Sequence, residues 1–220
     1  MKRSKDESFL VDLWEWIFRG LSYISVFYLV RKITKNRTYR FVDFWVIGNL
    51  LFSLLSSILV FYLHENLTWV MIILSIYGAL RVFEMIVYQI NVVFFDPYRS
   101  KNYKIKSTRR MILALFHNYV EIMFWFAVII YTVATVAHTH IANTLPEYLR
   151  YITSTMLCVA TFDRSVLENI VGDNLFIAQV IFLAIVAGLI MTVISIARFI
   201  GLLPSVNEID GTTDHLQKTK

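Results

Sequence analysis

Long apolar stretches alternate along this chain with short polar or basic connections. Four of the stretches are nearly free of charge and cover residues 44–63, 67–95, 118–137 and 174–200. A helix needs about 20 residues to cross a hydrocarbon core of about 30 Å, and each stretch reaches that length. Apolar residues make up 57% of the chain and charged residues only 17%, which excludes a soluble globular domain. The pattern predicts an all-α integral membrane protein.

A fifth apolar stretch, residues 9–30, has a course that the pattern leaves open. Its narrow, mostly polar stripe at three- and four-residue spacing comprises Asp12, Glu15, Arg19, Ser22 and Val26. One interpretation is a helix in the membrane interface, with Trp14 and Trp16 at headgroup depth and the basic N-terminal residues near anionic lipid. The other is a fifth transmembrane helix whose stripe is buried against its neighbours. A signal peptide is excluded by the acidic residues within the stretch.

The distribution of Lys and Arg predicts how the spans are oriented. Basic residues cluster at 31–40 and 99–110, whereas the connections 64–66 and 138–147 contain none. Basic loops remain on the cytoplasmic side. The polar tail, residues 204–220, ends with two further lysines. We therefore expect a multi-pass protein of the cell membrane with both termini in the cytoplasm.

Cytoplasmic termini require an even number of full crossings. Residues 148–162 must then enter and leave by the same face, and at about 15 residues this segment is too short to cross. Its aromatic, hydroxyl and aliphatic composition suits a half-helix surrounded by protein, preceded by Pro146 and by Glu147 at the positive end of the helix dipole. The residues from Cys158 to Asp163 are expected to turn back outward. The sequence thus predicts a re-entrant helix and loop.

The residues of this turn resemble the selectivity filter of tetrameric pore-loop cation channels, in particular bacterial potassium channels with a pattern such as TMTTVGYGD. The nine places of that pattern are occupied by Thr155, Met156, Leu157, Cys158, Val159, Ala160, Thr161, Phe162 and Asp163, of which the first, second, fifth and ninth match. Residues 196–201 are similar to the basic end of the inner helix in these channels. Gly188 stands where such helices often carry a gating hinge.

The resemblance covers about the second half of the chain and implies its organisation and function. Residues 105–203 would form a pore-like domain with a linker helix at 106–118, an outer helix, the re-entrant segment and an inner helix. Residues 1–40 and 41–104 would precede it as an N-terminal region and a transmembrane pair. The resemblance implies a homotetramer that passes monovalent cations, with Thr155, Thr161 and Asp163 lining the path.

Two glycine places of the filter pattern hold other residues, Ala160 and Phe162. A left-handed backbone costs about 1 kcal/mol at alanine and is an outlier at a bulky aromatic residue. A potassium-selective filter is therefore not expected, and the prediction is weak or altered selectivity. The alternative is a non-conducting, channel-derived scaffold or sensor subunit that recruits a cytoplasmic protein partner.

Ionisable residues within the spans are candidate functional residues, since burying one in lipid costs about 2.5 to 3.5 kcal/mol. Arg81 and Glu84 are three residues apart, and His117 and Glu121 are four apart, so each pair lies on one helix face. We expect both to be structural pairs. A proton relay or half of a metal site at His117 and Glu121 is the alternative.

Other chemistry is not indicated by the sequence. The residues near Ser154 and Cys158 lack a histidine or second acid at a reliable position beside them, so we do not expect an enzyme. The single cysteine, and the absence of zinc-type Cys/His spacing, argue against a metal site or a cofactor. The net charge of +5 is explained by membrane topology and lipid contact, and nucleic-acid binding is not expected.

Overall fold

The structure is a computed structural model that describes residues 9–21, 39–64, 67–95, 108–139, 141–172 and 174–200. All elements in these ranges are helices. They are α1 (Phe9–Leu21), α3 (Tyr39–Leu63), α4 (Thr68–Ile90), the π-helix η2 (Asn91–Phe95), α6 (Thr108–Val136), α7 (Leu145–Thr161), α8 (Ser165–Val171) and α9 (Leu175–Ile200). The basic connections expected in the cytoplasm and the tail, residues 204–220, lie outside the described residues.

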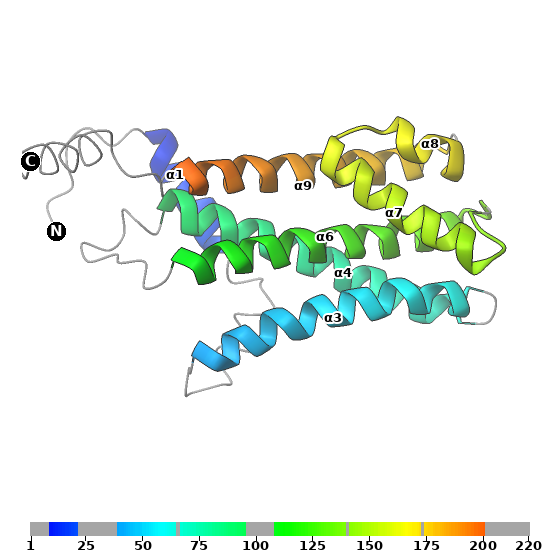
Figure 1. The fold of residues 1–220 in the computed structure, drawn as a ribbon. Coiled ribbons are helices and arrows are strands. Elements are labelled where there is room, and N and C mark those ends of the chain that lie inside the picture. Colours follow the sequence, from blue (N-terminus) through cyan, green and yellow to red (C-terminus); the bar gives the residue numbers. More distant parts are fainter. Residues whose placement is uncertain are drawn as a thin grey trace, which may run out of the picture.

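Four helices are long and apolar enough to cross a membrane, in agreement with the four predicted spans. They are Asp43–Leu63, Thr68–Phe95, Arg110–Val136 and Leu175–Ile200. Figure 1 shows them side by side in alternating directions, so that α3 begins and α9 ends at the same end of the bundle. We call this the open end, and the opposite one, where α3 is joined to α4, the turn end.

The third span differs from its prediction. Helix α6 runs without a break from Thr108, whereas a linker helix separate from the outer helix was expected at 106–118. The prediction of a separate linker helix is wrong within the described residues. No proline or glycine interrupts residues 108–136, so backbone hydrogen bonding continues past residue 118.

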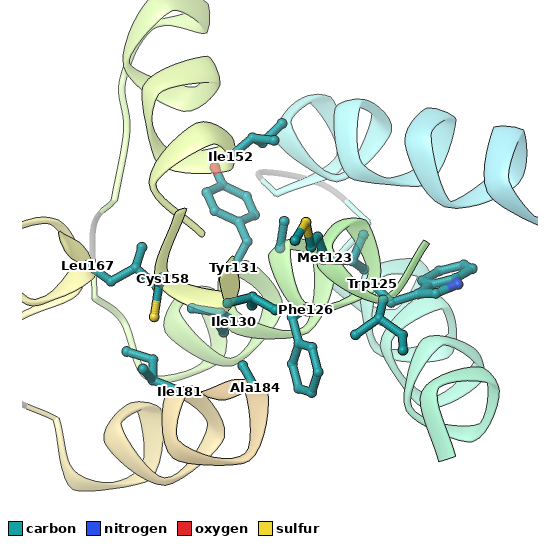
Figure 2. Packing of buried hydrophobic residues seen from close by; sticks show 14 of the residues in the cluster. Met123, Trp125, Phe126, Ile130, Tyr131, Ile152, Cys158, Leu167, Ile181 and Ala184 are labelled. Carbon is teal, nitrogen blue, oxygen red and sulfur yellow. The ribbon is translucent and has the colours of Figure 1, made fainter. Parts of the chain in front are cut away.

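Helix α6 occupies the centre of the bundle. In its most apolar stretch 61% of the residues are buried, against 28% to 39% in the other three spans. Figure 2 shows its side chains pointing in several directions, with Trp125 toward α4 and Tyr131 toward α7. The other long helices therefore pack around α6.

Helix α7 slants across α6 toward α9 (Figure 1). It starts at the turn end and its C-terminal end lies nearer the middle of the bundle. The chain then passes through α8 and returns to the turn end, where α9 begins. The segment between the last two spans thus begins and ends at the same end of the bundle.

Candidate functional site

A cluster of charged side chains connects α4 and α6 halfway along the bundle. Arg81 is the fourteenth of the 28 residues in its span. Its guanidinium donates to Glu84 on the same helix and to Glu121 on α6, with 3.1 Å between Nη2 and Glu121 Oε1. The three side chains are at most 5% exposed. One guanidinium is thus shared by carboxylates from two helices, in an interior where such contacts are poorly screened.

Aromatic and amide groups surround this charge cluster. The indole Nε1 of Trp125 donates to Glu121 Oε1 at 3.2 Å, and the Arg81 guanidinium lies 5.9 Å from the ring centre of Trp45. The Tyr77 ring packs edge-on against Trp125 at 5.3 Å, while its hydroxyl donates to Asn49 Oδ1 at 2.8 Å. Helix α3 therefore joins the network through the uncharged hydrogen bond at Asn49 and the contact of the Trp45 ring with the Arg81 guanidinium.

The two predicted ionisable pairs have different outcomes. Arg81 and Glu84 are paired as expected. Glu121, however, bonds to Arg81 and Trp125 and not to His117, whose Nδ1 lies 2.7 Å from the Leu113 carbonyl oxygen on its own helix. The physical reason is that α4 brings a full positive charge within reach of Glu121. A proton relay or metal half-site built on His117 and Glu121 has no support in this geometry.

The filter-like residues form a helix over most of their length. Helix α7 continues to Thr161, three residues past the turn expected at Cys158. The hydroxyl of Thr155 is buried and donates to the Tyr151 carbonyl at 3.0 Å, and that of Thr161 donates to the Leu157 carbonyl at 2.7 Å. Helical bonding uses the first carbonyls of residues 155–161 within α7, whereas the carbonyls of its last turn have no partner inside the helix.

The turn after α7 is centred on Phe162. Its backbone is left-handed, with φ 60° and ψ 25°, whereas Ala160 stays within the helix. Phe162 therefore adopts a left-handed backbone, which is an outlier for an aromatic residue, at one of the two places where the channel pattern has glycine. Asp163 follows, exposed to solvent. Hydrogen bonds from Ser165, through its side chain and its backbone N–H, lower the pKa of this carboxyl.

The end of α7 packs very closely against the middle of α9. Gly188 is the fourteenth of 26 residues in α9, and a Cβ built on it would collide with the carbonyl oxygen and a methyl group of Val159. The Tyr119 hydroxyl bridges this contact, lying 3.4 Å from the Val159 carbonyl oxygen and 3.3 Å from Thr192 Oγ1. Gly188, predicted as a hinge, has an observed role in close packing, and its hinge role stays a prediction.

The start of α7 is fixed by aromatic residues. The Tyr148 hydroxyl donates to the Ser57 carbonyl on α3, and that of Tyr151 donates to the Ala127 carbonyl on α6 at 2.7 Å. Farther along, Cys158 is buried against α8 and α9 (Figure 2), and burial raises the pKa of its thiol to about 11. A neutral thiol in such a place is inert packing.

Metal-ligating side chains are not gathered together within the described ranges. These ranges contain no group of three or more His, Cys, Asp or Glu side chains that could hold a metal. An apolar groove of about 340 Å³ on α6 and α7 is lined by Met123, Thr153, Met156, Leu157 and Ala160. Its apolar lining suits lipid or another helix better than a charged ligand.

No known protein family, curated protein or solved structure matches this chain. The candidate site is therefore defined by the geometry of its own residues. It has two parts, the charge cluster between α4 and α6 and the packed contact between α7 and α9.

Several residues that surround the charge cluster were not predicted from the sequence. Asn49, Tyr77 and Trp125 stand among apolar residues, where an aromatic or amide side chain has many roles. One signal was present on α3, where the buried residues Asn49, Ser53, Ser56 and Ser57 recur at three- and four-residue spacing. Small and polar residues on one face of a membrane helix mark its contact with other helices.

Proposed function

We propose that this chain is a pore-type membrane protein which, as an assembly of copies, passes monovalent cations with little discrimination between them. The observation that carries the proposal is the depth reached by α7. Its Val159 touches Gly188, which lies about 20 Å along α9 at 1.5 Å per residue. A short helix that descends to mid-depth between two spans, and then returns, is the arrangement that the resemblance to pore-loop channels implies.

Weak selectivity follows from the turn after α7. Only Phe162, Asp163 and Arg164 separate α7 from α8. Potassium channels replace the hydration shell of the ion with successive backbone carbonyls. Three residues, one of them an aromatic with a left-handed backbone, offer too few carbonyls for that, so a cation would pass at least partly hydrated.

The charge of the turn favours cations over anions. Asp163 is exposed and its lowered pKa keeps it ionised at neutral pH. Arg164 forms a 2.9 Å ion pair with Glu168, which moderates its positive charge. Several copies arranged about one axis, four by the resemblance, would bring a ring of carboxylates to the path at the depth where α7 ends.

Flux measurements on purified protein in liposomes test this proposal. We would compare K⁺ with Na⁺ for the wild type, Phe162→Ala and Phe162→Gly. If the ring obstructs the path, both substitutions raise flux. If the backbone of the turn controls it, only glycine changes flux, because alanine keeps the left-handed strain. Equal flux in all three proteins would place the path elsewhere and overturn the assignment.

A second candidate function is favoured by the helical state of residues 155–161. Their helical backbone is not an extended filter, which suits a scaffold or sensor subunit that has kept the pore architecture without conducting. Absence of flux from the wild type and both Phe162 variants, with insertion and oligomers verified, would select this second function.

A further inference from the structure

Helix α1 docks on η2, which follows α4 directly, through one narrow face. The Phe18 ring packs against Phe95 of η2 at 5.8 Å, and the Phe18 carbonyl accepts a hydrogen bond from Asn91 Nδ2 at 3.3 Å. Trp14, one turn earlier, stacks on Phe18 at 5.8 Å. These contacts attach α1 to the last residues of a membrane span.

Helix α1 crosses the bundle and does not run along it. Figure 1 shows it in blue at the open end, at a steep angle to α4 and α9. Its 13 residues extend about 20 Å at 1.5 Å per residue, too short for a hydrocarbon core of about 30 Å. The described part of α1 thus has neither the length nor the direction of a transmembrane helix.

The depth of α1 follows from the length of the span to which it is attached. Thr68–Phe95 has 28 residues, or about 42 Å, which exceeds the hydrocarbon core and matches a bilayer with its headgroups. With its middle near Arg81, its last turn lies among the headgroups. A helix resting on Asn91 and Phe95 lies at the same level.

The side of α1 opposite its docking face is apolar and exposed. At about 100° per residue, Phe9, Leu13 and Trp16 lie roughly opposite Phe18. Their exposed fractions are 80%, 41% and 75%. The ion-paired Glu15 and Arg19 project roughly a quarter of a turn from Phe18. The docking, polar and apolar sides of α1 are therefore separate, and the apolar side faces away from the residues on which α1 docks.

We infer that α1 is an interfacial lipid-binding helix, held to the protein by Phe18 and embedded in the bilayer surface by Phe9, Leu13 and Trp16. The inference rests on the four long helices crossing a bilayer and is independent of conduction. Lipid is the occupant because, at headgroup depth beside a span, any surface not covered by protein meets lipid. Tryptophan is also enriched at this level, where the apolar body and the polar N–H of Trp16 are both satisfied.

Spin-label accessibility tests the inference in full-length protein reconstituted in vesicles of phosphatidylcholine and phosphatidylglycerol. The single cysteine, Cys158, is replaced by serine, and a label is placed at Leu13→Cys or, as the matched position on the same helix, at Arg19→Cys. We expect the label at 13 to collide more with oxygen, which concentrates in lipid, than with the water-soluble complex Ni-EDDA. The label at 19 should show the opposite order.

Three results would overturn the inference. Greater collision with Ni-EDDA at both positions would put α1 in water, and greater collision with oxygen at both would put it inside the hydrocarbon core. Dipolar broadening at 13 that disappears on dilution with unlabelled protein would make a second copy the occupant. Phe18→Ala adds a check on docking, because it should increase the mobility of the label at 13 without exposing that label to Ni-EDDA.

Discussion

Two junctions meet the central helix α6, and they are held together in different ways. The α4–α6 junction consists of a guanidinium, two carboxylates and an indole N–H, all with defined hydrogen-bond directions. The α7–α9 junction depends on a missing side chain, because Gly188 lets the Val159 carbonyl approach closely. Hydrogen-bonded charges fix the register of the α4–α6 junction, and the space left at Gly188 fixes that of the α7–α9 junction. The first should therefore be sensitive to removal of a group, and the second to addition of one.

The largest effect is expected from Arg81→Met. It leaves Glu84 and Glu121 buried at mid-depth without their shared guanidinium, and breaking a buried ion pair costs about 3 to 5 kcal/mol. We would measure the free energy of unfolding in mixed micelles. Adding Glu121→Leu should recover part of the loss, since one buried carboxylate is then removed.

Arg164→Met is the matched control for this prediction. The Arg164–Glu168 pair is 42% and 48% exposed, and exposed ion pairs contribute about 0 to 1 kcal/mol. If Arg81→Met were no more harmful than Arg164→Met, water would have access to the α4–α6 junction and its burial would be refuted.

The next prediction compares the stability effects of alanine substitutions at two glycines. Gly188→Ala forces a methyl group into the Val159 carbonyl, and overpacking of this kind costs about 1 to 3 kcal/mol. Gly48→Ala on α3 meets nothing within 4 Å and should stabilise the helix by about 0.5 to 1 kcal/mol. Thermal unfolding of both variants checks the opposite signs. A stabilised Gly188→Ala protein would mean that α7 and α9 are farther apart than described.

A smaller effect is expected at the turn beyond this junction. Phe162→Gly should be more stable than Phe162→Ala by about 1 to 2 kcal/mol, because only glycine adopts the left-handed backbone without strain. The comparison removes the ring in both variants, so loss of its packing cancels. Midpoints of denaturant unfolding give the difference, and greater stability of the alanine variant would show that the turn is not left-handed.

The smallest effect concerns Asp163 and pH. Because hydrogen bonds from Ser165 lower the pKa of Asp163 in the folded state, its ionised form contributes stability above the unfolded pKa. This contribution is lost as the pH falls through the folded pKa. Wild type should therefore melt at a slightly higher temperature than Asp163→Asn at pH 7, and the two should converge once the pH is below the folded pKa of Asp163. A gap that stays constant as the pH is lowered through this pKa would exclude ionisation of Asp163 as its cause.

The spans were predictable because apolar length is a local property. Four stretches of sufficient length became four helices, and their ends moved by a few residues except at the start of α6. Helix α7 begins at the turn end and ends nearer the middle of the bundle, in keeping with its short length, and its re-entrant course through a membrane stays a prediction.

The two junctions were less predictable because they depend on which helices become neighbours. Arg81 was assigned its local partner, Glu84, but the sequence gives no measure of how near Glu121 comes on α6. Likewise, Gly188 suggested a hinge, while its observed contact with Val159 exists only once α7 has been laid across α9. Spacing along one helix could be read from the sequence, whereas proximity between residues of different helices could not.

The shared guanidinium has a consequence for how the protein is made. Arg81 and Glu84 belong to the same helix, so the charge of α4 has a partner as soon as that helix leaves the ribosome. Glu121 is synthesised later, and it meets a guanidinium that already has one carboxylate partner. The order of the charges along the chain thus compensates Arg81 before α6 and the final bundle exist.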